Sequence, residues 1–108
     1  MINVIFKRKN SKLISFDICG HAGYDTYGND IVCSGVSAIS TTIVNGIIEV
    51  LNIEVSYEIK DGFLSLNLIE LSDQDIDKCS VLMETMLLGF KSMTINYSEY
   101  INVTIEEV

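Results

Sequence analysis

The sequence contains no proline, and we find no internal linker, low-complexity segment or repeat in it. A chain of 108 residues is the size of one domain and leaves no room for two. Its content of 48% hydrophobic and 20% charged residues is that of a folded globule rather than a disordered chain. We therefore expect a single domain over residues 1–108, with one core and one functional site.

Long apolar stretches are also scarce, and none approaches the roughly 20 consecutive apolar residues that a membrane-spanning helix needs. At the N-terminus the positive charge of Lys7 and Arg8 follows the apolar residues instead of preceding them, and no small-residue cleavage site comes after. This order is wrong for a signal peptide. We expect residues 1–8 to form a strand and the protein to be cytoplasmic, without a membrane partner.

Cysteine is rare, and the number of cysteines is odd. The three residues are Cys19, Cys33 and Cys79, and no two of them have CxxC spacing. This pattern argues against a disulfide framework and indicates reduced thiols.

Positive charge is in short supply, with 7 Lys and Arg against 15 Asp and Glu and a formal net charge of -8. Such a surface repels phosphate backbones, which argues against direct binding of nucleic acid. It suits a basic protein partner. An equally simple interpretation is that the acidity only keeps the protein soluble.

Apolar periodicity and turn signals predict seven elements in the order β-β-α-β-β-α-β. The predicted strands cover residues 1–8, 12–19, 53–59, 62–69 and 97–105. One helix is predicted over 31–51, and a second begins at Ser72 and ends near 91–93. An Asp-Gly turn at 61–62 predicts that the third and fourth strands form a hairpin. The apolar face predicted for the second helix is Ile76, Cys79, Met83, Met86 and Phe90. The fold class is therefore α+β, a two-layer domain whose mostly antiparallel sheet carries both helices on one face. The order of the strands in the sheet cannot be predicted from the sequence.

The first predicted helix is almost entirely apolar and carries one charge, Glu49. We therefore expect it to be buried on most sides, either at the centre of the domain or in a dimer interface.

Chemistry concentrates in residues 19–37, which hold the only histidine and two of the three cysteines. If Asn29 or Asp30 is the N-cap of the first helix, Cys33 lies in its first turn. Free backbone N–H groups and the helix dipole there would stabilise a thiolate and a developing oxyanion. Cys33 is therefore a candidate nucleophile.

His21 follows the second predicted strand, and eleven residues separate it from Cys33. A loop of this length can fold back, so the imidazole can take the thiol proton and later protonate a leaving amine. The plain alternative is a small buried cysteine and an exposed histidine. Cys19, His21 and Cys33 could also hold zinc, with Asp25 or Asp30 as a fourth ligand.

Residues 20–24 (GHAGY), 28–33 (GNDIVC) and 36–38 (VSA) closely resemble the signature of the ribosomal-processing cysteine protease Prp family. The predicted order of elements is similar to that family over essentially the full length. Two positions depart from the family pattern: Ser34 replaces an alanine common in relatives, and Cys19 precedes the motif glycine. Neither departure removes a catalytic atom.

The resemblance implies a specific function, which composition and residue spacing alone do not predict. Members of the family are cytoplasmic homodimers that remove a short N-terminal extension from large-subunit ribosomal protein L-twenty-seven. The family's catalytic dyad falls on His21 and Cys33, and its other motif positions fall on Gly20, Asp30 and Ser37. No metal or other cofactor is implied.

Physical roles follow for these supporting positions. Gly20 would give His21 backbone freedom, and Asp30 would cap the helix or orient His21. Ser37 lies one helical turn after Cys33, so its hydroxyl can face the same site. The sequence thus predicts a cysteine endopeptidase. The alternative is a non-catalytic ribosome-assembly module that binds a basic ribosomal protein without cutting it.

Overall fold

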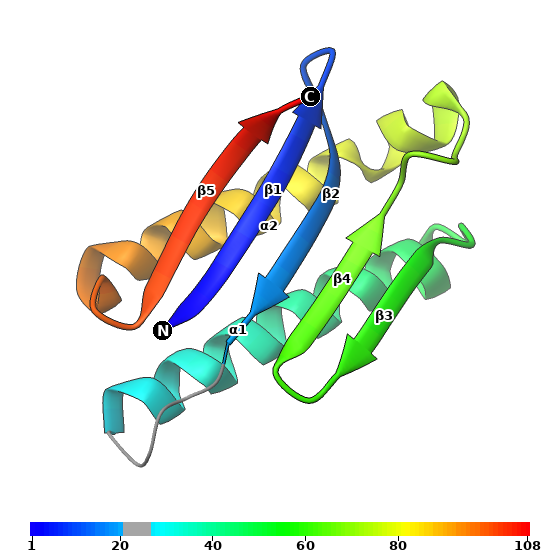
Figure 1. The fold of residues 1–108 in the computed structure, drawn as a ribbon. Coiled ribbons are helices and arrows are strands. Elements are labelled where there is room, and N and C mark those ends of the chain that lie inside the picture. Colours follow the sequence, from blue (N-terminus) through cyan, green and yellow to red (C-terminus); the bar gives the residue numbers. More distant parts are fainter. Residues whose placement is uncertain (21–26) are drawn as a thin grey trace.

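The computed structural model describes residues 1–20 and 27–108 of the chain. Within these residues a five-stranded sheet is covered by two long helices (Figure 1). The elements are β1 (Ile2–Lys9), β2 (Lys12–Cys19), α1 (Tyr27–Asn45), the π-helical turn η1 (Gly46–Val50), β3 (Ser56–Lys60), β4 (Phe63–Asn67), α2 (Asp73–Tyr97) and β5 (Ile101–Glu107). The predicted α+β class and element order are confirmed.

The strand order in the sheet is β3-β4-β2-β1-β5. Every neighbouring pair is antiparallel except β1 and β5, which run parallel. The exception arises because α2 follows β4 and carries the chain across the back of the sheet to the edge beside β1 (Figure 1). The two helices lie together on one face, as the sequence predicts.

Two tight turns set the registers of the hairpins. Asn10 and Ser11 between β1 and β2 both have positive φ, 52° and 72°, which is the geometry that matches the twist of a two-residue hairpin. Between β3 and β4 the predicted Asp-Gly turn places Gly62 at φ 71°. In both turns the strands therefore pair directly at the turn, and in β1–β2 an irregularity between Lys7 and Arg8 shifts the register after two residue pairs.

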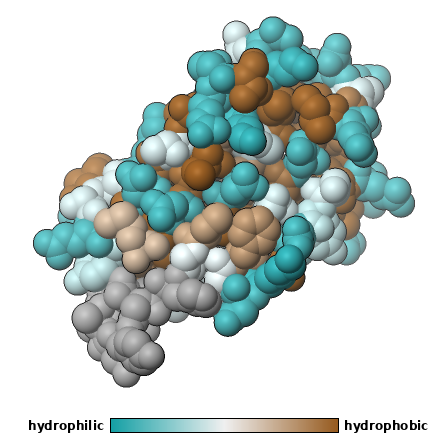
Figure 2. Space-filling model, viewed as in Figure 1, coloured by the Kyte–Doolittle hydropathy of each residue, from teal (hydrophilic) through white to brown (hydrophobic). Residues whose placement is uncertain are grey.

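The core lies between the sheet and the two helices. At its centre the Phe6 ring is 6.1 Å from Phe16 and 6.3 Å from Phe90, measured between ring centroids. The predicted face of α2 is entirely buried, namely Ile76, Cys79, Met83, Met86 and Phe90. The other face of the sheet mixes polar and apolar side chains and is open to solvent (Figure 2). Burial on one face only is what the alternation along β1 predicts.

Helix α1 does not lie at the centre of the domain, and within the single chain it is buried on one side only; the alternative of a dimer interface stays a prediction. Its core side is buried, as at Val32, Val36 and Ile43, but Ala38 and Thr42 on the other side are exposed. The outward positions carry small side chains, which raise the apolar content of the helix without requiring burial. Val50 is exposed because the π-helical turn shifts the helix phase away from its earlier period.

The helical segment Ile31–Val50 is long and apolar enough to cross a membrane by length and composition alone. The expectation that no segment approaches this limit is therefore wrong. Core helices of soluble proteins pass the same test, and α1 together with η1 packs against α2. Its contacts with the core account for one side of the segment, and the outward side carries mostly small side chains.

Helix α2 begins where the sequence predicts and ends later. Its N-cap is Ser72, whose hydroxyl accepts a hydrogen bond from the backbone N–H of Asp75 at 3.1 Å. The helix continues to Tyr97 instead of ending near 91–93, so the last strand starts at Ile101. The predicted strand start at Tyr97 is wrong because Tyr97 packs against the core from the last turn of the helix.

We expect Ser72→Ala to lower the free energy of unfolding by about 1 kcal/mol, because it removes the acceptor for an N–H of the first turn. Ser92→Ala is the matched control in the same helix. The exposed Ser92 hydroxyl bonds only the Leu88 carbonyl, so its removal should leave stability unchanged or slightly raised. Urea denaturation measures both. Equal losses for the two variants would contradict a capping role for Ser72.

Candidate active site

A groove of about 390 Å³ lies between α1, the end of β2 and the β3–β4 hairpin. Three of the five predicted site residues line it: Gly20, Cys33 and Ser37. The opposite wall is formed by the hairpin, which the sequence analysis did not connect with the site. The full lining is Ile2, Ile18, Gly20, Cys33, Val36, Ser37, Ser40, Thr41 and the hairpin residues 59–64.

Gly20 joins the end of β2 to the hairpin. Its backbone N–H donates a hydrogen bond to the Gly62 carbonyl at 3.0 Å, which extends the β2–β4 pairing by one residue pair. Its φ is +118°, and a Cβ at this position would lie 2.3 Å from the Met1 carbonyl oxygen. No other residue fits there without a backbone shift.

Cys33 and Ser37 lie one turn apart on α1 and both line the groove. The Cys33 side chain is half-buried and Ser37 is exposed. Burial of Val32 and Val36 on the same helix fixes which way α1 faces. The groove side of α1 is therefore held in place by core packing.

The remaining predicted site residues are only partly described. His21 and Asp25 lie outside the described residues; His21 directly follows Gly20 in the chain. Asp30 lies in the first turn of α1, and its side chain is outside the described part.

The predicted helix start is wrong, and the error affects the argument for Cys33. Helix α1 begins at Tyr27, so Asn29 and Asp30 lie inside it and do not cap it. Cys33 is consequently in the second turn, whereas only the first four N–H groups lack a helical partner. The dipole effect also fades beyond the first turn, so neither thiolate nor oxyanion stabilisation by the helix start applies to Cys33.

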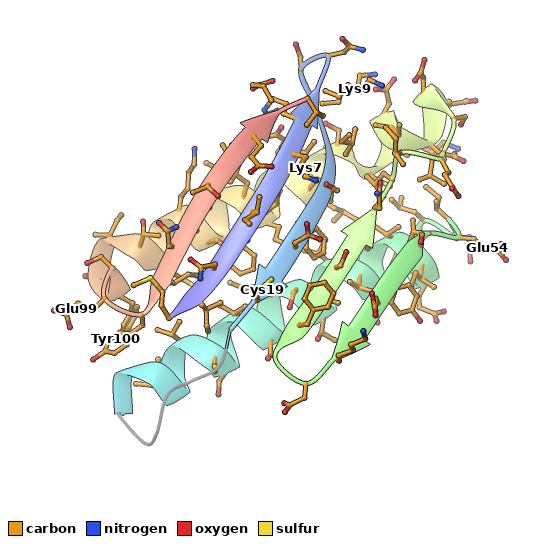
Figure 3. The ribbon with its side chains drawn as sticks, viewed as in Figure 1. Lys7, Lys9, Cys19, Glu54, Glu99 and Tyr100 are labelled. Carbon is orange, nitrogen blue, oxygen red and sulfur yellow. The ribbon has the colours of Figure 1, made fainter. Side chains whose placement is uncertain are left out.

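The three cysteines have different surroundings. Cys79 is fully buried on α2, and burial, with a smaller contribution from the Asp75 charge, raises the pKa of its thiol. Cys19 alternates with the core residue Ile18, so it lies on the open face of the sheet (Figure 3). Cys33 lies on the helix side and lines the groove. Only Cys33 of the three combines access with a binding surface.

The zinc alternative gains no support from the described residues. No group of three His, Cys, Asp or Glu side chains in residues 1–20 and 27–108 could hold a metal ion. Cys19 and Cys33, two of the proposed ligands, lie on different sides of the sheet.

Known proteins share both the sequence and the fold. The family model described as cysteine protease Prp matches residues 1–102. The chain belongs to the cysteine protease Prp family. It is 29% identical over 108 residues to ribosomal processing cysteine protease Prp of Bacillus subtilis, covering 96% of each chain.

Solved structures share the same architecture. The crystal structure of SMU.848 from Streptococcus mutans superimposes with a TM-score of 0.90 at 32% identity, over 100% of this chain and 96% of that one. Staphylococcus aureus Prp is 27% identical, over 98% of this chain and 100% of that one. It has been solved with a substrate peptide (TM-score 0.86) and with a covalently linked product peptide (TM-score 0.84).

Membership of the Prp family makes this protein a cysteine protease, an enzyme that hydrolyses peptides. The alternative of a non-catalytic binding module is therefore set aside. The hairpin wall of the groove is the part of the site that sequence reasoning missed. Its only sequence signal was the Asp-Gly turn, which locates a hairpin along the chain and leaves its neighbours in the sheet undetermined.

We expect Gly20→Ala to lower the free energy of unfolding by about 2 kcal/mol, because the new Cβ meets the Met1 backbone at a positive φ. Gly89→Ala is the control. A Cβ at this position in α2 makes only an ordinary contact, 3.8 Å from the Ile39 side chain, and should stabilise the helix by about 0.5–1 kcal/mol. Urea denaturation distinguishes the two. A neutral Gly20→Ala would contradict the close approach to Met1.

Proposed function

We propose that Cys33 is the nucleophile of this protease and His21 its general base. The observation that carries the proposal is the position of Cys33 in the groove, because a nucleophile must reach a bound peptide. Gly20 lines the same groove, and the following residue in the chain is His21.

Peptide hydrolysis then takes two steps. The imidazole takes the thiol proton, and the Cys33 sulfur attacks the scissile carbonyl carbon to form a tetrahedral intermediate. This intermediate collapses to a thioester as the imidazolium gives its proton to the leaving amine. Water, deprotonated by the same imidazole, attacks the thioester carbonyl, and the thiolate leaves and is reprotonated.

The supporting residues have separate roles in this proposal. Gly20 keeps the backbone before His21 close to the hairpin, where its N–H bonds the Gly62 carbonyl. The Ser37 hydroxyl, exposed at the groove one turn after Cys33, donates a hydrogen bond to the bound peptide. Asp30 orients His21 rather than capping the helix, since the helix begins before it.

The substrate we propose is large-subunit ribosomal protein L-twenty-seven carrying its N-terminal extension. Charge distribution supports a basic substrate. Four of the 7 Lys and Arg residues lie between Lys7 and Lys12, and none of the 15 acidic residues does. This segment surrounds the β1–β2 turn, at the opposite end of β2 from Gly20. The rest of the protein is strongly acidic and attracts a basic partner.

We also propose that the protein is a cytoplasmic homodimer. Apolar side chains that lie exposed on the helix layer support a second copy there, with Val81 at 74% and Leu88 at 63% exposure. These two residues are separated by two turns of α2 and therefore share one side of the helix.

Cys33→Ala should abolish removal of the extension from the ribosomal protein, because no other group replaces the sulfur nucleophile. Cys19→Ala and Cys79→Ala should keep most of the activity, since neither residue lines the groove. Mass spectrometry of the ribosomal protein after incubation measures the cut directly. Normal cleavage by the Cys33 variant would rule out the assignment, and an uncut protein with the wild-type enzyme would rule out this substrate.

Light scattering at micromolar concentration should give twice the 12.0 kDa mass of one chain. Leu88→Lys should reduce it to the mass of a monomer, because a charge would be buried in the apolar contact. Lys91→Ala, a change at an exposed residue one turn away, is the control and should leave the mass unchanged. A monomeric wild-type protein would contradict the dimer.

A further inference from the structure

Two hydrogen bonds at the ends of β4 show which neighbouring strand the backbone groups of each β4 residue face. The Gly20 N–H bonds the Gly62 carbonyl, and the Leu68 N–H bonds the Ile14 carbonyl. In an antiparallel ladder, backbone groups alternate between the two neighbouring strands. The even-numbered residues of β4 therefore bond β2, and the odd-numbered residues bond β3.

This alternation fixes the direction of the backbone groups in β3. The odd-numbered residues of β4 are paired with Ser56, Glu58 and Lys60. Tyr57 and Ile59 therefore direct their N–H and C=O groups away from β4, towards the outer edge of the sheet. No strand among the described residues pairs with that edge.

The same two residues expose apolar side chains. Tyr57 and Ile59 are paired with Leu66 and Leu64, so their side chains point to the helix side of the sheet. Yet Tyr57 remains 50% exposed and Ile59 66% exposed, while Leu66 is fully buried. The edge thus combines free backbone groups with uncovered apolar side chains on the side of the groove.

The groove connects this edge to Cys33. Its lining includes Ile59 and Lys60 on β3 and runs along α1 from Cys33 past Ser37 to Thr41. From Cys33 to Thr41 the helix rises by eight steps, which span about 12 Å at about 1.5 Å per step. An extended peptide at about 3.3 Å per residue covers this length with three or four residues.

We infer that the substrate binds as an additional β-strand on the free edge of β3, with an apolar side chain against Ile59. The inference rests on the proposed role of Cys33, since that role places the scissile bond in the groove. Main-chain pairing supplies affinity in this mode, and alternate side chains supply specificity.

Amide hydrogen exchange of the Cys33→Ala variant tests the inference without cleavage. The probe is a synthetic peptide with the N-terminal extension of the ribosomal protein and the residues just after the cut. In the free protein the amides of Tyr57 and Ile59 should exchange fast, whereas those of Glu58 and Lys60 should already be protected by β4. Saturating peptide should slow exchange at Tyr57 and Ile59 by at least about tenfold.

Three other results would overturn the inference. One is peptide binding without protection at Tyr57 and Ile59, and another is the absence of any protection at millimolar peptide. The third is protection of both amides before peptide is added, growing with protein concentration, since a second copy then occupies the edge. Cleavage by the wild-type enzyme is scored separately, so a failure of the proposed nucleophile remains distinguishable.

Steady-state kinetics of Ile59→Thr supplies a second readout. This change keeps the β-branched shape and removes apolar contact, so KM should rise by about three- to tenfold with little change in kcat. Ile95→Thr is the same substitution at an exposed residue, and its site lies on α2 outside the groove. It should leave KM unchanged. Equal effects of the two substitutions would contradict a contact at Ile59.

Discussion

The hydrogen bond between the Gly20 N–H and the Gly62 carbonyl is the contact on which the site depends. It holds the tip of the β3–β4 hairpin against the end of β2, so the hairpin can form one wall of the groove. The opposite wall is α1, fixed by the burial of Val32 and Val36. A residue with a Cβ would strike the Met1 carbonyl, so the joint requires glycine at this position. Backbone geometry at Gly20 thus fixes the hairpin wall of the groove, and core packing fixes the α1 wall.

Much of the fold could be predicted because its signals are local. Alternation placed β1 and β2, and the five residues predicted for one face of α2 are all buried. Element ends were less predictable. Residues 27–30 belong to no apolar period in the sequence, so the helix was predicted to begin later than it does. An apolar period marks where a helix meets the core, which need not be where the helix begins.

The site was predictable where it follows a contiguous motif and unpredictable where it depends on strand order. Gly20, Cys33 and Ser37 were identified from the sequence and do line one groove. The hairpin wall was missed because the pairing of β2 with β4 joins residues more than forty positions apart. Local residue preferences carry no information about such pairing. The prediction that Cys33 lies at the start of the helix was wrong for a simpler reason: the helix begins at Tyr27, before the predicted N-cap.

The two edges of the sheet differ in how they are protected. At one edge, β5 ends in the consecutive charges Glu106 and Glu107, which oppose pairing with another strand. At the other edge, β3 has neither proline nor bulge, and its charged pair, Lys60 with Glu58, lies on the open face of the sheet. The groove side keeps Tyr57 and Ile59 uncovered. Only two residues of β3, Tyr57 and Ile59, direct backbone groups outwards, so this edge offers a partner few hydrogen bonds. Such an edge suits a peptide that must bind, be cut and leave.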